Sequence, residues 1–220
     1  MTTITLTFDN GPDPDVTPLV LDTLARHGLL STFFVVGEKL RDRRHIAERA
    51  HRERHWIGNH TYSHTVPLGL STAPGSALSE IAQTETLIGE LAHPRRLFRP
   101  FGGGGVLDQR LLNREAVKYL QENAYTCVLW NVIAHDWSHP EGWVERALDL
   151  SFARQHALVV LHDLPTGAMH DLDRFIAAAK DHGAIFTQDF PRDCVPIERG
   201  SIIRSIEAYV SEGDRFMGMN

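Results

Sequence analysis

Short β-rich runs alternate with helical stretches along most of the chain, and this alternation constrains the fold more than any other feature of the sequence. Runs enriched in β-branched and aromatic residues predict seven strands, at residues 3–8, 32–36, 56–58, 97–99, 125–131, 158–161 and 184–186. Helices are predicted at residues 17–27, 38–54, 76–91, 108–122, 141–152 and 168–181. Such alternation indicates βα units in a parallel sheet, and seven strands favour an α/β barrel that is closed or nearly closed.

One domain accounts for residues 1–220, because no internal repeat, low-complexity tract or linker rich in Pro, Gly and Ser interrupts the pattern. The final segment, about residues 197–220, carries Ile202, Ile203, Ile206 and Val210. We predict an amphipathic helix there, with its apolar side packed on the barrel.

Composition argues against several kinds of partner. The formal net charge is −6 and the basic residues are spread along the chain, so nucleic acid is not an expected partner. No apolar run approaches the roughly 18 residues needed to span a bilayer, so no membrane partner is expected. The chain opens with a predicted strand and shows no signal peptide, which predicts a cytoplasmic protein whose Cys127 and Cys194 stay reduced. The sequence does not indicate an oligomeric state.

Chemistry-bearing side chains follow five of the seven predicted strands. In parallel α/β barrels the loops at the carboxyl ends of the strands build the active site, so groups that follow different strands meet on one face. The groups in question are Asp9 and Asn10, the pair His60 and His64, Arg99, the pair Asp136 and Trp137, and His162 with Asp163. Packing alone is a poor explanation for such clustering, and the sequence therefore predicts a functional site at this end of the barrel.

The histidine pair is a weak signal when taken alone. His60 and His64 are four residues apart, so on a helical turn both rings face one way and can hold one metal ion. His51 and His55 have the same spacing but lie among charged residues, which is typical of a solvated helix face. Spacing therefore permits a metal site without establishing it, and the position of His60 after a strand is what favours it.

The other groups also have ordinary interpretations. Asp9 and Asn10 precede Gly-Pro and are typical of a turn. A single strand-end arginine such as Arg99 is usually an ion-pair donor, and a single histidine such as His162 is more often part of a core. The glycines at residues 102–105 lack the Lys-Ser/Thr of a phosphate-binding loop and predict a flexible or tightly turning loop.

Taken in order, these pieces resemble the polysaccharide deacetylase family, also called the NodB-homology domain or family 4 carbohydrate esterases. Five short motifs carry the resemblance. Residues 7–12 resemble the family motif T-F-D-D-G-P, and residues 60–64 resemble H-[ST]-x-x-H. Residues 98–100 resemble the start of F-R-P-P-Y-G, and residues 130–137 resemble W-x-x-D-x-x-D-W. Residues 160–163 resemble the last motif, a hydrophobic pair before His. The resemblance implies a distorted (β/α)7-type barrel of parallel strands. It also implies removal of acetyl groups from N-acetylated sugars.

The resemblance also implies roles for individual residues. Asp9 would be the general base that takes a proton from water, Arg99 would hold Asp9 ionised, and His162 would be the general acid for the leaving amine. Asn10, His60 and His64 would hold a divalent metal, with Zn²⁺ the expected ion. The expected substrate-binding residues are Pro100, Phe101, Gly102 (through its backbone N–H), Asp136, and Trp137 as an apolar wall for the acyl methyl group.

Two departures from the family pattern concern the metal and the substrate loop. Asn10 stands where the family has a metal-binding Asp, which removes the anionic ligand and predicts weaker metal binding or none. The usual aromatic residue is missing at Gly102, which predicts a more open or more mobile substrate loop.

A third departure concerns the predicted acid. Ile133 stands where the family often has the Asp that partners the catalytic histidine, so the pKa of His162 is expected to be lower than in the usual site. Asp136 and Asp163 are the two carboxylates that would compensate.

Three functions remain open at this point. The first is metal-assisted deacetylation of an N-acetylated sugar; because no signal peptide is visible, a small chitooligosaccharide or another acylated amine is a more natural substrate than a cell-wall polymer. The second is metal-independent hydrolysis of a small amide or cyclic ureide, as in allantoinase-like relatives, a route that Asn10 opens while staying compatible with the first. The third is a non-catalytic carbohydrate-binding relative, against which the retained Asp9, Arg99 and His162 argue.

Overall fold

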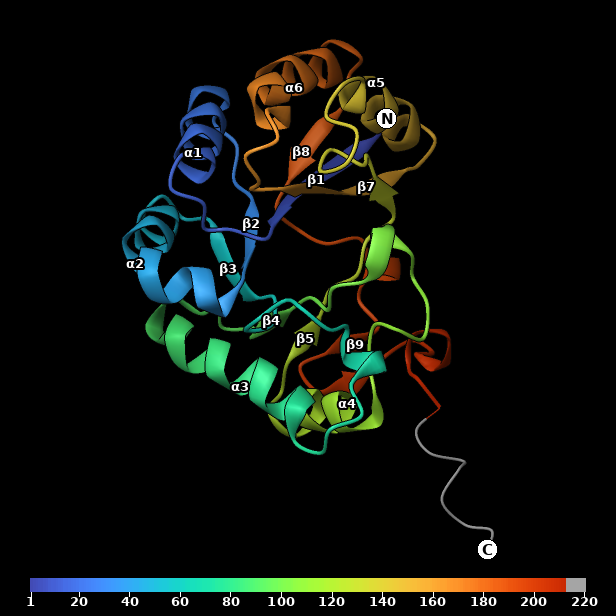
Figure 1. The fold of residues 1–220 in the computed structure, drawn as a ribbon. Coiled ribbons are helices and arrows are strands. Elements are labelled where there is room, and N and C mark those ends of the chain that lie inside the picture. The colour runs from blue at the N-terminus through green and yellow to red at the C-terminus, as the bar shows by residue number, and fades with distance from the viewer. Residues whose placement is uncertain (213–220) are drawn as a thin grey trace, which may run out of the picture.

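A curled, mostly parallel sheet forms the centre of the protein, and helices surround it in the computed structural model, which describes residues 1–212 (Figure 1). The strands are β1 Thr3–Asp9, β2 Thr32–Val35, β3 Trp56–Asn59, β4 Leu97–Phe98, β5 Thr126–Cys127, β6 Val132–Ile133, β7 His156–His162, β8 Ile185–Thr187, β9 Ile197–Glu198 and β10 Ser201–Ile202. The helices are α1 Val16–His27, α2 Gly37–Arg52, α3 Ser76–Ile88, α4 Arg114–Glu122, α5 Trp143–Phe152 and α6 Leu172–Asp181. The strand order is β10-β9-β5-β4-β3-β2-β1-β7-β6, with β8 attached to β1. The predicted distorted α/β barrel of parallel strands is confirmed, although the described residues form ten strands instead of seven; β1, β3 and β7 are longer than predicted, and β2, β4 and β5 are shorter.

The register of the central strands brings Asp9 and His162 to the same level. β1 and β7 pair along their whole lengths, from Thr3 beside His156 to Asp9 beside His162. On the other edge of β1, β8 pairs with the first half of the strand and β2 with the second half, where Asp9 lies beside Phe34. Two strand ends from distant parts of the chain therefore meet at the carboxyl end of the sheet.

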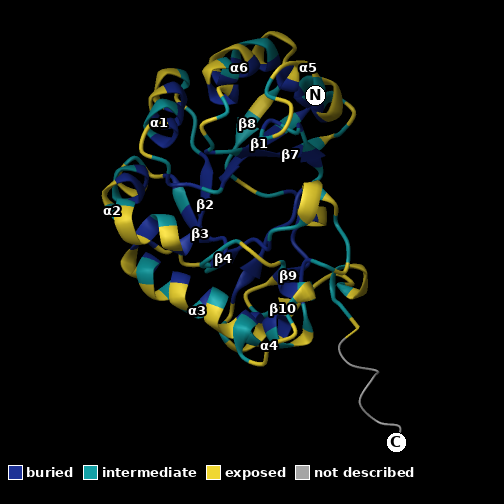
Figure 2. Cartoon of the chain, viewed as in Figure 1, coloured by how far each residue is buried: buried dark blue, intermediate teal, exposed yellow. Residues whose placement is uncertain are grey.

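Alternation along β1 separates the core from the interior of the barrel. Ile4, Leu6 and Phe8 are almost fully buried in the apolar cluster that also contains residues of α1, α5 and α6. Successive side chains of a strand point to opposite faces, so Thr7 and Asp9 face the inside of the barrel. A second apolar cluster joins β4 and β5 to α3 and α4. Figure 2 shows the result, with buried residues on the strands and exposed residues on the outer faces of the helices.

The predicted strand at residues 125–131 is wrong in its length. The segment pairs as β5 only at Thr126–Cys127, and the next strand, β6, begins at Val132. The carbonyl oxygens of Val128 and Leu129 accept hydrogen bonds from the Arg99 side chain at 3.1 and 3.3 Å. These carbonyls are therefore committed to a buried guanidinium instead of a β-ladder.

The predicted C-terminal helix at about 197–220 is also wrong for the residues that the structure describes. β9 and β10 form a hairpin whose turn contains Arg199 (φ 47°) and Gly200 (φ 80°), a conformation that no right-handed helix contains. β9 pairs antiparallel with β5, and Ile197 is fully buried there. A short 3₁₀ turn, Glu207–Tyr209, follows, and residues 213–220 of the predicted helix lie outside the described residues. Within residues 1–212, no helix is both long enough and apolar enough to cross a bilayer.

Candidate active site

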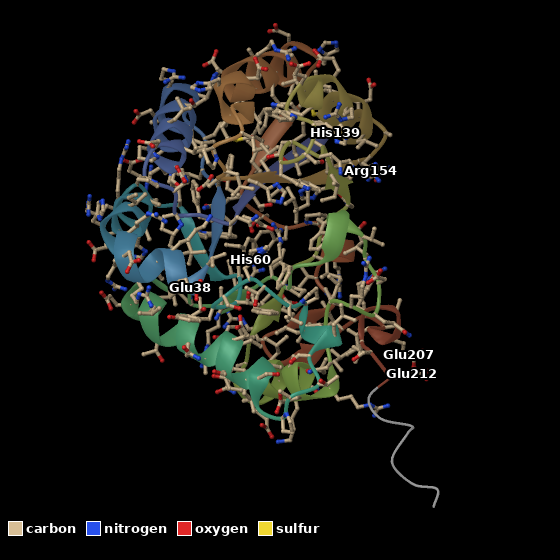
Figure 3. The ribbon with its side chains drawn as sticks, in the orientation of Figure 1. Glu38, His60, His139, Arg154, Glu207 and Glu212 are labelled. Carbon is tan, nitrogen blue, oxygen red and sulfur yellow. The ribbon has the colours of Figure 1, made fainter. Side chains whose placement is uncertain are left out.

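A cavity of about 280 Å³ opens at the carboxyl end of the barrel strands. It is lined by Asp9, Asn10, His60, His64, Pro100, Phe101, Gly102, Gly103, Gly104, Gly105, Trp130, Ile133, Trp137, Val160, His162 and Leu164. Nine of the residues predicted from sequence are in this lining, while Arg99 and Asp136 lie buried directly behind it. Figure 3 places His60 near the middle of the ring of strands. The structure therefore brings the five strand-end motifs together.

Asp9 lies at the floor of the cavity and is only 3 % exposed. The Arg99 guanidinium donates from Nη1 to Asp9 Oδ1 at 2.8 Å, and His60 Nε2 lies 3.6 Å from Asp9 Oδ2. Burial by itself raises the pKa of Asp9, but the Arg99 charge and the His60 and His162 imidazoles outweigh burial and hold the pKa below its ordinary value. Asp9 is therefore ionised at neutral pH.

Arg99 is fully buried with its donors satisfied on several sides. Besides Asp9, it donates to Thr7 Oγ1 at 2.8 Å and to the two carbonyls after β5. Its guanidinium carbon also lies 4.1 Å from the centre of the Phe34 ring. Removing a buried charge from its partner is costly, so this packing fixes both the charge and the position of Asp9.

His162 lies beside Asp9 at the end of the neighbouring strand β7 and is held by Asp136. Asp136 Oδ1 accepts from His162 Nδ1 at 2.9 Å, and Asp136 Oδ2 accepts from the His162 backbone N–H at 2.8 Å. With the proton on Nδ1, the Nε2 atom is directed away from Asp136. Burial lowers the pKa of His162, but the hydrogen bond and charge of Asp136 outweigh burial, and the pKa is raised.

Two expectations about this pair need correction. The pKa of His162 does not fall for want of a carboxylate at Ile133, because Asp136 supplies the partner. Asp136 itself is 1 % exposed and uses both oxygens on His162, so it does not face the substrate cavity as predicted.

Asp163, the other carboxylate considered, points to the opposite side of the first motif. Its Oδ2 accepts from Thr17 Oγ1 at 2.6 Å, and burial raises its pKa to about 7. A Cβ on Gly11 would lie 2.5 Å from the same Oδ2, so this position requires glycine. Asp163 therefore supports the loop that follows β1 and does not partner His162.

His60, His64 and Asn10 meet at the cavity as potential metal ligands. The His60 Nδ1 donates to the Arg99 carbonyl at 2.8 Å, which leaves Nε2 unprotonated, and the His60 and His64 rings are 4.9 Å apart. Burial lowers the pKa of both histidines, that of His64 to about 3, so both are neutral. Asn10 Oδ1 is buried and has no hydrogen-bond partner among the described residues. Two neutral imidazoles and one unpartnered amide oxygen fit a divalent cation, although within residues 1–212 no three His, Cys, Asp or Glu side chains are placed to hold a metal ion by themselves.

The loop that carries Asn10 is held by the start of α2. Lys39 Nζ donates to the Asn10 carbonyl at 2.7 Å, and the Val36 N–H donates to the Gly11 carbonyl at 2.9 Å. Asn10 has a left-handed backbone (φ 70°), which Asn adopts more readily than most residues. These bonds fix the direction in which the Asn10 amide points.

The remaining wall of the cavity is apolar. The Phe101 ring stacks on His64 at 4.0 Å, and the Trp137 ring lies edge-on to His162 at 4.6 Å. Trp130 Nε1 donates to the Gly105 carbonyl at 2.9 Å and so anchors the glycine loop.

Sequence reasoning missed Trp130, Val160 and Leu164 as parts of this wall. One available signal was alternation along β7, since Val160 is two residues before His162 and shares its face.

The fold and the site together define an α/β barrel protein with an ionised carboxylate and a carboxylate-held histidine side by side at the carboxyl end of the strands. The sequence profile of the family described as "Polysaccharide deacetylase" matches residues 1–128. The chain belongs to the polysaccharide deacetylase family.

Three individual relatives of the chain are also named as deacetylases. The chain is 32 % identical over 191 residues to a peptidoglycan-N-acetylglucosamine deacetylase of Bacillus cereus, covering 83 % of this chain and 65 % of that protein. It is 34 % identical over 180 residues to a chitooligosaccharide deacetylase of Rhizobium leguminosarum, covering 76 % and 73 %. A solved peptidoglycan N-acetylglucosamine deacetylase superposes with a TM-score of 0.68 at 30 % identity, covering 84 % of this chain and 85 % of that one. The chain thus spans less than two thirds of the Bacillus cereus relative's length.

Proposed function

We propose that the protein is a hydrolase that removes the acetyl group from the nitrogen of an N-acetylated amino sugar, in an oligosaccharide. The observation that carries this proposal is the opposite shift of two pKa values in one cavity, that of Asp9 lowered and that of His162 raised. A site that pushes the pKa values of two groups apart, one toward the ionised base and the other toward the protonated acid, assigns them the roles of general base and general acid. The names of the relatives support an N-acetylated sugar as the substrate class.

In the proposed reaction, Asp9 accepts a proton from the water that attacks the acyl carbon. His162 donates a proton to the amine nitrogen as the carbon–nitrogen bond breaks. Arg99 keeps Asp9 ionised through their hydrogen bond, and Asp136 keeps the His162 ring turned so that Nε2 is free. The products are acetate and the free amino sugar.

We propose that Asn10, His60 and His64 hold a divalent cation, with Zn²⁺ as the expected ion. The unpartnered Asn10 oxygen and the free His60 Nε2 support this assignment. When bound, the ion would polarise the acyl carbonyl and lower the pKa of the attacking water. In this proposal Asn10 takes the place of the metal-binding Asp of the family, so the site binds the ion with less negative charge.

The apolar wall is assigned to the acyl group and the sugar. Trp137 and Val160 flank His162 and would contact the acetyl methyl group, while Pro100 and Phe101 would contact the sugar. We also assign the Gly102 backbone N–H to the acyl oxygen, where a donor stabilises the charge that develops during attack.

Acetate release from short N-acetylglucosamine oligomers by the purified protein, with and without added Zn²⁺, tests the proposal. Release that requires the metal and disappears in Asp9→Asn supports it. No release from any N-acetyl sugar in a panel of oligomers would overturn it.

A second candidate function is suggested by the proposed metal ligands Asn10, His60 and His64, because none of them carries a negative charge. Metal-independent hydrolysis of a small amide or cyclic ureide would use the same Asp9 and His162. Turnover of such amides that survives prolonged chelation, with no metal retained by the protein, would favour it over deacetylation.

A further inference from the structure

The segment from His60 to His64 has a conformation that needs support from outside. Thr61 (φ 67°) and His64 (φ 53°) both adopt the left-handed region, which is uncommon for residues other than glycine. For a β-branched residue such as Thr61 this conformation is strained and persists only when the surroundings impose it. Neighbouring elements must therefore impose the path of this loop.

Three consecutive backbone N–H groups of the loop donate to side-chain oxygens. The Thr61 N–H donates to Asn59 Oδ1 at 3.0 Å. The Tyr62 and Ser63 N–H groups both donate to Glu80 Oε2 at 2.9 Å. The Ser63 hydroxyl donates to the other oxygen of the same carboxylate, Oε1, at 2.7 Å. Glu80, on α3, thus accepts three hydrogen bonds from two neighbouring residues.

The opposite side of the loop is bound by α2. The Thr61 carbonyl accepts from the Gly37 N–H, and the Tyr62 carbonyl accepts from the Glu38 N–H, both at 3.0 Å. The peptide groups before His64 are therefore fixed on both sides, by the first amides of α2 and by the Glu80 carboxylate.

Glu80 is half-buried, and within residues 1–212 no Lys, Arg or His lies within ion-pair distance of it. Its neighbour on α3 supports the loop indirectly, because the Ile81 carbonyl accepts from Nδ2 of Asn59, whose Oδ1 binds the Thr61 N–H. The charge of Glu80 is thus used on loop N–H and O–H groups and not on a salt bridge. Charge-assisted bonds of this kind are shorter and stronger than neutral ones.

We propose that Glu80 is a positioning residue for His64. Glu80 acts through the Tyr62 and Ser63 peptide groups, because their orientation sets the position of the His64 imidazole ring. The His64 ring lies 4.9 Å from the His60 ring and 4.0 Å from the Phe101 ring. Keeping it there requires the backbone before His64 to stay in place, and Glu80 binds that backbone. The inference rests on the metal site of the proposed function, since it assigns to Glu80 the geometry of one of the three ligands.

The test compares Glu80→Ala and Glu80→Gln with Glu85→Ala as a matched control. Glu85 lies on the same helix and uses its carboxylate on Tyr119 and Arg96, away from the loop. Metal-stripped proteins are titrated with Zn²⁺ by calorimetry and with Co²⁺ by absorption, and the thermal midpoint of each variant is measured alongside.

We expect Glu80→Ala to bind Zn²⁺ about 10- to 100-fold more weakly than the parent and to alter the Co²⁺ spectrum, as loss of a group that orients a ligand does. Glu80→Gln keeps one oxygen for the two N–H donors, so it should recover most of the affinity. Glu85→Ala should lower the thermal midpoint and leave the affinity unchanged.

Parental Zn²⁺ affinity in Glu80→Ala would overturn the positioning role, as would an equal loss of affinity in Glu85→Ala. A parent that binds neither ion would overturn this inference together with the proposed metal site. A parent that binds Zn²⁺ but releases no acetate would overturn only the proposed function, because the affinity series still decides the role of Glu80.

Discussion

The two walls of the cavity differ in how their backbone is held. Asp9 and His162 stand at the ends of β1 and β7, which pair along seven residues each. Arg99 and Asp136 lie behind them and are almost fully buried. The facing wall rests on the glycine loop and on β6, which is two residues long, and Gly103 and Gly104 are exposed. The groups proposed to transfer protons are thus fixed by the sheet, whereas the surface proposed to meet the rest of the substrate belongs to a loop.

This difference has a consequence for how the protein tolerates change. A side chain whose partners are buried hydrogen-bonding groups cannot be altered without leaving those partners unsatisfied. A loop whose two side-chain hydrogen bonds, from Trp130 and Arg110, reach only its backbone carbonyls can be altered with smaller cost. Substitutions on the first wall should therefore reduce kcat, and substitutions on the second should mainly change KM.

The largest effect is expected for Asp9→Asn. The amide cannot accept the proton from water, so kcat should fall by about 10²- to 10⁴-fold. The buried Arg99 charge also loses its partner, which should lower the free energy of unfolding by about 3–5 kcal/mol. Acetate release and urea denaturation measure the two effects. Asp173→Asn, which changes an exposed carboxylate paired with Arg26 and His27, is the control; parental turnover in Asp9→Asn would refute the base assignment.

The next effect is a change of pH dependence in Asp136→Asn. The proposed acid is protonated His162, so activity is present below its pKa and is lost as pH rises through it. Asp136 raises that pKa. Without this carboxylate, the alkaline limb of the kcat profile should move to lower pH, and kcat at neutral pH should fall about tenfold.

The matched control for this profile is Asp163→Asn. Its carboxyl group bonds Thr17 and not the imidazole ring, so the alkaline limb should keep its place. An Asp136→Asn profile that superimposes on the parental one would show that the ring does not depend on Asp136.

A third substitution adds charge to the first wall. Asn10→Asp should tighten Zn²⁺ binding by about tenfold or more, because an anionic oxygen replaces a neutral one beside a divalent cation. Calorimetric titration of metal-stripped protein measures the change. Asn123→Asp, at the end of α4, adds the same charge away from the cavity, and equal affinities in all three proteins would mean that Asn10 is not a ligand.

The smallest effect is expected on the second wall, in Gly105→Ala. A Cβ there would lie 3.0 Å from the Ile133 side chain, on a backbone with φ 76°. We expect KM to rise about two- to fivefold with little change in kcat, and stability to fall by about 1–2 kcal/mol. Gly104→Ala has the same backbone strain (φ 69°) but nothing within 4 Å of the new Cβ. If Gly104→Ala raised KM equally, contact with Ile133 would not be the cause.

Local patterns were enough to predict most of the fold, because the long strands and helices are periodic in the sequence itself. The segments whose predicted structure was wrong depend on partners that are distant in the sequence. The carbonyls of residues 128 and 129 bond Arg99 and not a neighbouring strand, and Ile197 joins the sheet by pairing with Cys127 of β5. Neither partner is visible in a short window of sequence.

The residues of the site also fall into those predictable from local sequence and those that depend on distant contacts. Strand ends identified Asp9, His60, Arg99 and His162 because their position follows from barrel geometry alone. Asp136 is one of two candidate partners of His162 from sequence, and only the folded chain shows that both of its oxygens bind His162 and that it does not line the cavity. Likewise, Glu80 lies on a helix with no motif, and its part in the histidine loop depends on three contacts across the fold.

The hairpin of β9 and β10 bears on how the chain is made. During synthesis, β4 and β5 leave the ribosome well before residues 197–202, which cover the outer edge of β5 in the finished protein (Figure 1). Until then that edge is open to strands of other nascent chains, the usual starting point of aggregation. Yield of soluble protein should therefore be more sensitive to changes at Ile197 and Gly200 than their distance from the cavity suggests.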